Sequence, residues 1–329
     1  MKTTPLLKAG ALVALSALSF TGCGLKPSTP EVPNVAPAQI QALDGAKGEQ
    51  FTVASKNFTE QLILGKIAVI VADAAGFDVV DMTNIPGSQP ARKVLVNGDV
   101  DMEWEYTGTA WMTYMGNEES IADQTQMWNA VHAADQENGL TWGAPSTLNN
   151  TYAMAVRRDF AEQNGLQKLS DMTKLPASER TLCVEAEFNS RSDGLGGMLE
   201  TYDLPRGSAQ GIVDSNISVM DTGTVYTATA DGACNFGEVF TTDGRIKALD
   251  LVVLDDDKKY FPAYNASPVF STETLEEHPQ LADEYQKVAQ KLNNDVMMEL
   301  NYKVDVEGQE PANVAYDWMV QEGLVAPGE

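Results

Sequence analysis

Histidine and cysteine are scarce in this sequence, whose 329 residues include 2 histidines and 3 cysteines. With only His132 and His278 available, little is left for a Ser-His-Asp or Cys-His catalytic arrangement. The sequence also lacks a Cys-x-x-Cys pair and a Gly-x-x-x-x-Gly-Lys phosphate loop, which argues against a metal site and a nucleotide site. We therefore expect a protein that is not an enzyme and that carries no metal and no cofactor.

Basic residues are few as well. Lysine and arginine total 22 against 47 acidic residues, which gives a formal net charge of −25. Contacts to phosphate groups need a basic surface, so nucleic acid is excluded as a partner. A hydrophobic fraction of 43% is ordinary for a globular protein. The acidic balance is explained by a solvated surface, and the length predicts two domains or one large one.

Paired carboxylates of the kind that glycosidases use are also not expected. Glu103 and Glu105 flank Trp104, the last residue of the predicted strand Val100–Trp104. We expect the two side chains on opposite faces of that strand, which would prevent them from acting as one catalytic pair.

The N-terminus reads as an export signal. Lys2 and Lys8 precede the apolar run Ala9–Phe20, which is too short to span a membrane comfortably. The following Thr21-Gly22-Cys23 resembles a bacterial lipobox, with Phe20 where leucine is usual. The resemblance implies a signal peptide over 1–22, cleavage before Cys23 and lipidation of its thiol. An ordinary signal peptide with an incidental cysteine is the alternative.

The segment 23–50 is predicted to be the lipid anchor and a tether, because it contains Pro27, Pro30, Pro33 and Pro37. Two further cysteines, Cys183 and Cys234, fall in predicted strands. An even number of cysteines outside the cytoplasm favours a disulfide between them. Two buried free thiols are the alternative.

Short apolar strands alternate with amphipathic helices after the tether. Strand Phe51–Ala54 precedes a helix whose capping chemistry is expected at Asn57–Glu60 and whose end is expected at Gly76. Further strands near 79–80 and 100–104, with helices between them, predict a parallel sheet. A second α/β unit follows, with predicted strands at 152–156, 181–184, 217–220, 233–240 and 251–254. The last third of the chain is predicted to be helical, with helices at 272–278, 279–293 and 311–322.

Two such units predict an α/β protein of two lobes with a ligand cleft between them. Lobe 1 is expected to be discontinuous and to comprise 51–150 and 246–329. Lobe 2 is expected to comprise 151–245. The chain would then cross between the lobes near Asn150 and again between Thr242 and Leu251.

Aromatic residues stand at the ends of several predicted strands. Tyr106, Tyr152, Phe240 and Tyr264 are each placed where side chains of successive strands converge. Converging aromatic faces attract a quaternary ammonium group, which has no hydrogen-bond donors. Lys56 and Arg191 add cations at similar junctions, so the set matches a zwitterion with a trimethylammonium group at one end and a carboxylate at the other.

Five motifs, in order along 51–323, make the sequence similar to the glycine betaine/carnitine/choline substrate-binding proteins of osmoprotectant ABC transporters. They are Ser55-Lys56-Asn57-Phe58-Thr59-Glu60-Gln61, Ala91-Arg92-Lys93, Glu105-Tyr106-Thr107-Gly108-Thr109-Ala110, Asn149-Asn150-Thr151-Tyr152-Ala153 and Thr242-Asp243-Gly244-Arg245-Ile246. The resemblance implies the two-lobed type II periplasmic-binding fold and no catalytic activity. It also implies an extracytoplasmic, lipid-anchored monomer that delivers its ligand to an ABC permease.

The resemblance also implies a set of ligand-binding residues. The family's aromatic cage falls on Tyr106, Tyr152, Phe240 and Tyr264, its carboxylate-binding set falls on Lys56, Thr109 and Arg191, and Asn150 matches a polar position beside the cage. Phe240 replaces the tyrosine that is common at its place, and it keeps the aromatic face without the hydroxyl. Thr109 favours carboxylate ligands such as glycine betaine, because choline-restricted relatives can carry an acid there.

Three alternatives remain at this stage. The first is a binding protein for choline or another small solute, the second is an exported enzyme with a two-lobed fold, and the third is a cell-wall interaction protein without a small ligand.

Overall fold

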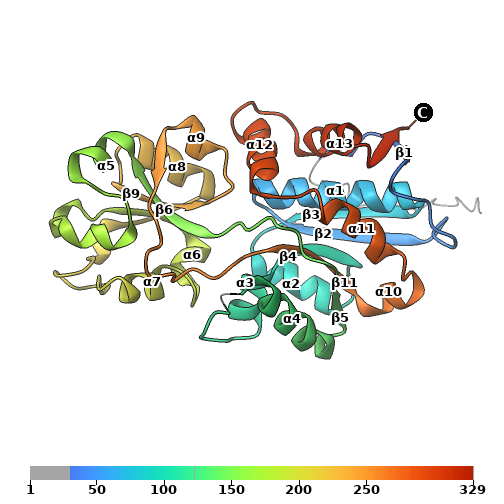
Figure 1. Cartoon of the computed structure of the whole chain (residues 1–329), viewed down its shortest axis with the longest axis horizontal. Coiled ribbons are helices and arrows are strands. Elements are labelled where there is room, and N and C mark those ends of the chain that lie inside the picture. The colour runs from blue at the N-terminus through green and yellow to red at the C-terminus, as the bar shows by residue number, and fades with distance from the viewer. Residues whose placement is uncertain (1–29, 122, 329) are drawn as a thin grey trace, which may run out of the picture.

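A computed structural model describes residues 30–121 and 123–328 of the chain. The predicted signal peptide and the predicted lipidation site Cys23 lie outside the described residues. The described chain forms two α/β lobes that lie side by side along the long axis of the molecule (Figure 1).

Lobe 1 is built on a five-stranded sheet with the order β3-β2-β4-β11-β5. Strand β2 pairs in parallel with β3 and β4, as the alternation of strands and helices predicts, whereas β11 runs antiparallel to β4 and β5. The strands are β2 (Gln50–Lys56), β3 (Asp78–Ile85), β4 (Met102–Tyr106), β5 (Leu140–Trp142) and β11 (Ala266–Ser271). A short pair, β1 (Val35–Pro37) and β12 (Val325–Pro327), joins the two ends of the described chain.

Helices cover both faces of this sheet. The most buried of them, α1, has an apolar surface that reaches nearly all round and ends at Gly76, whose φ of 104° needs glycine. The lobe 1 helices are α1 (Thr59–Ala75), α2 (Ser88–Val96), α3 (Thr107–Thr109), α4 (Gln124–Asp135), α10 (Thr272–Glu277), α11 (Leu281–Ala289), α12 (Asn294–Asp305) and α13 (Pro311–Gln321). A π-helical turn, Ala110–Tyr114, continues α3.

Lobe 2 is built on a second five-stranded sheet with the order β10-β6-β9-β7-β8. Its strands are β6 (Tyr152–Arg157), β7 (Leu182–Glu185), β8 (Ile217–Met220), β9 (Phe236–Phe240) and β10 (Leu251–Val253). Its helices are α5 (Arg158–Asn164), α6 (Ala186–Ser190), α7 (Leu195–Thr201), α8 (Thr222–Ala230) and α9 (Arg245–Ala248). A disulfide joins Cys183 in β7 to Cys234, which lies just before β9 rather than within a strand.

The second lobe extends further along the chain than the sequence predicts. Strand β10 pairs antiparallel with β6, with Leu251 opposite Arg157. The chain therefore returns to lobe 1 between Val253 and Ala266, and the expected boundary at residue 246 is wrong. The reason is that a three-residue apolar strand carries no local signal for the sheet that it joins, which is decided by pairing partners about a hundred residues away.

The predicted tether is also partly wrong. Residues 35–37 form β1, and the side chains of Ile40 and Ala46 are fully buried against lobe 1. Lys66 of α1 donates a hydrogen bond to the carbonyl oxygen of Pro30 at 2.7 Å. The prolines indicated a tether, but the apolar residues that follow Pro37 attach this segment to the folded lobe.

Strand β11 and helix α12 have no counterpart among the predicted elements. β11 contains Pro268, which cannot donate to a neighbouring strand and normally argues against an interior strand. Its carbonyl nevertheless accepts a hydrogen bond from the backbone N–H of Gly143. α12 begins at a capping residue, Asn293, whose side chain accepts from the N–H of Val296.

Candidate functional site

A cleft of about 610 Å³ lies between the two lobes. All eight residues that the sequence predicts for ligand binding line it. They come from both lobes and from the two segments, 143–151 and 254–265, that cross between the lobes. These eight are Lys56, Tyr106, Thr109, Asn150, Tyr152, Arg191, Phe240 and Tyr264.

Strand ends place these side chains. Lys56 and Tyr106 are the last residues of β2 and β4, two parallel neighbours whose carboxyl ends face lobe 2. In the other lobe Tyr152 begins β6 and pairs with Phe240 at the end of β9. Tyr264 and Asn150 lie on the two crossing segments and are joined by a hydrogen bond from the N–H of Asn150 to the carbonyl of Tyr264. The cleft thus sits where strand ends of both sheets converge.

The aromatic side chains form a continuous wall. The ring centroid of Tyr152 lies 5.4 Å from that of Phe240 and 5.6 Å from that of Tyr264. The planes of the Tyr152 and Tyr264 rings form an angle of 85°. Phe58 was not among the proposed residues, yet it also lines the cleft and stacks on Tyr106 at 6.2 Å and on Phe240 at 5.3 Å. The wall therefore contains five aromatic rings, and Phe58 connects the tyrosine of lobe 1 to the phenylalanine of lobe 2.

The sequence does not predict Phe58 as a ligand-binding residue, because the segment around it indicates a helix cap. Phe58 itself is the N-cap of α1, and no side-chain capping hydrogen bond is made there. Glu60 turns inward instead, where it accepts hydrogen bonds from the hydroxyl of Tyr106 at 2.7 Å and from Asn150 at 3.0 Å. Burial raises the pKa of Glu60 above its ordinary value, although its hydrogen bonds oppose the shift.

The cations of the site are already paired. Lys56 Nζ lies 2.6 Å from Glu105 Oε1 and 5.1 Å from the centre of the Tyr106 ring. Arg191 donates two hydrogen bonds to Asp193, at 2.7 and 2.5 Å, and a third to Glu187 at 3.1 Å. A ligand carboxylate would therefore meet cations that are shared with protein carboxylates, and not unpaired positive charge.

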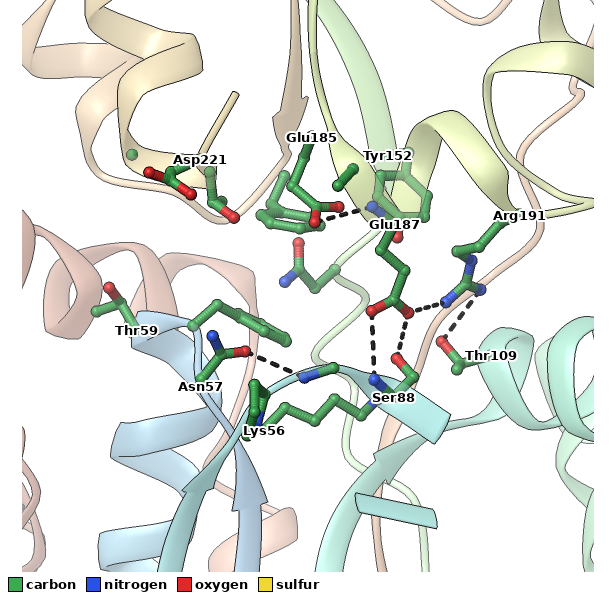
Figure 2. A pocket seen from close by; sticks show the side chains of 18 of the residues that line it. Lys56, Asn57, Thr59, Ser88, Thr109, Tyr152, Glu185, Glu187, Arg191 and Asp221 are labelled. Atoms are coloured by element: carbon green, nitrogen blue, oxygen red, sulfur yellow. Dashed lines mark hydrogen bonds and ion pairs between the residues drawn. The ribbon is translucent and has the colours of Figure 1, made fainter. Parts of the chain in front are cut away.

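Glu187 links the two lobes at the polar end of the cleft. Figure 2 shows its carboxylate reaching Ser88 at the start of α2, where it accepts from the backbone N–H at 3.2 Å and from the hydroxyl. Arg191 lies beside it and reaches Thr109 of lobe 1 at 3.5 Å. Burial alone would raise the pKa of Glu187, but the Ser88 hydrogen bonds and the charges of Lys56 and Arg191 hold it below its ordinary value.

Glu103 and Glu105 do not point to opposite faces, so that expectation is wrong. Residues two apart on a strand share a face, and the charge of Glu105 adds to burial in raising the pKa of Glu103 to about 8. Both side chains are almost completely buried, and neither lines the cleft. They form a buried acidic pair behind Lys56 and have no access to a substrate there.

Within residues 30–121 and 123–328, no cluster of three or more histidine, cysteine, aspartate or glutamate side chains is arranged to hold a metal ion. The helices of the same residues include none with the length and apolar character of a membrane span.

The chain matches the family model for the substrate-binding domain of ABC-type glycine betaine transport systems over residues 49–321. It is 36% identical to a glycine-betaine-binding protein of Pseudomonas aeruginosa, over 86% of this chain and 91% of that protein. It is 30% identical to an ergothioneine transport permease/ergothioneine binding protein of Helicobacter pylori, over 83% of this chain and 47% of that protein.

The fold agrees with these matches. A crystal structure of a glycine betaine/carnitine/choline ABC transporter superposes with a TM-score of 0.68 and 26% sequence identity, over 84% of this chain and 99% of that one. The described two-lobed α/β architecture is therefore the one that the sequence predicts. This chain belongs to the substrate-binding domain family of ABC-type glycine betaine transport systems.

Proposed function

We propose that this protein captures a small quaternary ammonium osmoprotectant such as glycine betaine in the cleft and delivers it to an ABC importer. It acts as a monomer and leaves the ligand chemically unchanged. The observation that carries the proposal is the wall of five aromatic rings in an interlobe cleft. Stacked and edge-on rings of this kind surround a trimethylammonium group, which cannot form hydrogen bonds and is attracted by the ring faces.

The polar end of the cleft supports a zwitterionic ligand. Lys56, Thr109 and Arg191 lie together there, but Glu105, Asp193 and Glu187 share the charge of the two cations. The carboxylate of glycine betaine would compete with Glu187 for Arg191. A ligand without a carboxylate, such as choline, would leave that arrangement in place, which is why choline is the second candidate.

Isothermal titration calorimetry with glycine betaine, carnitine, choline and ergothioneine tests the proposal. All four carry a trimethylammonium group, and L-proline, which carries none, is the matched control. We expect saturable binding of at least one of the four and none of L-proline. Binding of none of the four would overturn the proposed function.

Arg191→Ala separates the two candidate ligand classes. We expect this variant to lose affinity for glycine betaine much more than for choline. Only glycine betaine has a carboxylate, and the variant removes a cation that would bind it. Arg191→Lys is the control that keeps the positive charge. Equal losses for both ligands would mean that Arg191, which holds the buried Asp193, supports the fold of lobe 2 instead of recognising a carboxylate.

We further propose that the mature protein is held on the outer face of the cytoplasmic membrane through a lipid on Cys23. The apolar run ends at Thr21-Gly22-Cys23, and a proline-bearing segment follows it. Replacing Cys23 with serine should move the protein from the membrane fraction to the soluble extracytoplasmic fraction. Unchanged membrane association would contradict this anchor.

A further inference from the structure

Glu60 lies one layer behind the aromatic wall. It is the second residue of α1, only 2% of its surface is exposed, and it does not line the cleft itself. It touches the cleft through Tyr106, whose ring faces the cleft and whose hydroxyl donates to Glu60 Oε1 at 2.7 Å. The carboxylate and the ligand cavity are therefore separated by one tyrosine ring.

Four groups donate hydrogen bonds to this carboxylate, and all four are neutral. Besides Tyr106, they are Asn150 at 3.0 Å, the Thr242 hydroxyl at 2.5 Å and Asn301 at 3.3 Å. They come from β4, from a crossing segment, from lobe 2 and from α12. Four donors suit an ionised carboxylate, which only accepts.

No cation compensates that charge within the described residues that contact Glu60. Arg245 lines a small void that Glu60 also lines, but it is paired with Asp243 and Asp305. Lys56 Nζ lies 5.1 Å from the centre of the Tyr106 ring, but it is paired with Glu105. A buried carboxylate without an opposite charge is costly, even when it is fully hydrogen-bonded. A quaternary ammonium group resting on the cleft side of Tyr106 would supply the missing positive charge.

We propose that Glu60 is the counter-charge of the ligand's ammonium group and that it acts through Tyr106. This inference rests on the proposed function. The hydrogen bond fixes the orientation of the Tyr106 ring, and a phenol that donates to a carboxylate has a more electron-rich ring. Both effects strengthen the attraction of the ring for a cation. Glu60 is thus a positioning residue that selects for positive charge and not for shape.

The same arrangement gives binding a pH dependence. Burial holds the pKa of Glu60 above its ordinary value in the free protein, and a cation across the ring would lower it again. Affinity for the cation therefore falls as the pH falls through the pKa of Glu60. Other charged groups face Glu60 or its partner Tyr106: Asp243 and Arg245 from lobe 2, Asp305 from α12, Glu105 from β4, and Lys56 from β2.

Glu60→Gln tests the proposal, because it removes the charge and keeps the size and one acceptor. The probes are glycine betaine and its uncharged-headgroup isostere 3,3-dimethylbutanoate, together with choline and 3,3-dimethylbutan-1-ol. We expect roughly tenfold weaker binding of the ammonium ligands and unchanged binding of the isosteres. The acid-side loss of affinity should also disappear in the variant.

Two further variants keep the test sharp. Glu284→Gln is the matched control, because Glu284 is a nearly buried glutamate of α11 that lies outside the cleft, and it should change nothing. Tyr106→Phe keeps the charge of Glu60 but breaks its link to the ring, and it should give a smaller loss that is again confined to ammonium ligands.

The outcomes separate the two proposals. A wild-type protein that binds no ammonium ligand overturns the proposed function and the role of Glu60 with it. If the wild-type protein binds such a ligand, two results would overturn only the role of Glu60. The Glu60→Gln variant could bind the ammonium ligand as well as the wild type does, or it could lose affinity for the ammonium ligand and for its isostere by the same factor.

Discussion

Tyr152 occupies the centre of the aromatic wall. Its ring contacts those of Phe240 and Tyr264, and the Arg191 guanidinium carbon lies 5.6 Å from its centre. Burial raises its pKa well above the ordinary value, so the hydroxyl stays neutral at physiological pH. This side chain therefore presents an aromatic face to the cleft without adding a charge.

We predict that Tyr152→Ala weakens ammonium binding by roughly 5- to 30-fold, because one desolvated cation–π contact is lost. Tyr152→Phe should cost less, since the aromatic face remains. Calorimetric titration measures both. Tyr316→Ala, in α13 and outside the cleft, is the control and should bind normally. Wild-type affinity in the Tyr152→Ala variant would remove this residue from the cage.

At the scale of elements, α3 approaches the second crossing segment so closely that only glycine fits between them. A Cβ on Gly108 would lie 2.7 Å from Tyr264 Cδ1 and 2.8 Å from the carbonyl oxygen of Ala263. The ring of Tyr264 is held in turn by a 2.7 Å hydrogen bond to Asp193. The position of this ring in the aromatic wall is thus set by backbone packing as well as by its own hydrogen bond.

We predict that Gly108→Ala displaces Tyr264 and lowers ligand affinity, with a stability cost of about 1–3 kcal/mol for the overpacked contact. Gly196→Ala in α7 is the matched control, because nothing lies within 4 Å of its Cβ position and its backbone is not left-handed. Titration and thermal unfolding of both variants check the prediction. A Gly108→Ala protein with normal affinity would show that Tyr264 can move without loss.

The disulfide ties two neighbouring strands of lobe 2. Cys183 and Cys234 are 51 residues apart in the sequence, with Cα atoms 5.7 Å apart. Closing a loop of that length restricts the unfolded chain and typically contributes about 2–4 kcal/mol. We predict that the Cys183→Ala, Cys234→Ala double variant unfolds at a lower temperature and still binds ligand when folded, because neither residue lines the cleft. An unchanged melting temperature would contradict this contribution.

At the scale of the whole molecule, each sheet buries an acidic side chain whose pKa is raised to about 8. Glu103 of β4 and Glu238 of β9 are almost fully buried, and burial is the main cause that raises the pKa of each to about 8. The negative charge of Glu105 adds to the shift of Glu103, and that of Glu185 adds to the shift of Glu238. The ordinary value for an exposed glutamate is 4.5. Between these values the native protein holds more protons than the unfolded chain, so its stability falls as the pH rises through that window.

We predict that the melting temperature decreases from about pH 5 to about pH 8.5. Glu60, Asp73, Glu185 and Asp305 also have raised pKa values and act in the same direction. Combining Glu103→Gln with Glu238→Gln should flatten the decrease, since an amide does not titrate. Thermal unfolding across this pH range measures it. A melting temperature that rises with pH in the wild-type protein would contradict the raised pKa values of Glu103 and Glu238.

The sequence by itself determined the class of the fold and most of the residues of the aromatic wall. Alternating strands and helices are local patterns, and a residue at the end of a parallel strand faces the ligand edge of its sheet whatever the other details are. Lys56, Tyr106 and Phe240 stand at such strand ends, whereas Tyr152 begins the antiparallel strand β6. With Thr109, Asn150, Arg191 and Tyr264 they line one cleft. Gly76 marked the end of α1 for an equally local reason.

Only the tertiary structure decided what depends on distant partners. β10 joins lobe 2 because its backbone pairs with β6, and Ile40 is buried because α1 and its neighbours cover it. Phe58 joins the aromatic wall because Phe240, from the other lobe, stacks on it. The charge balance of the cleft has the same origin. The sequence places the cations Lys56 and Arg191 at strand junctions, but only the fold brings Glu105, Glu187 and Asp193 to them, because buried charges are stable only when they are paired.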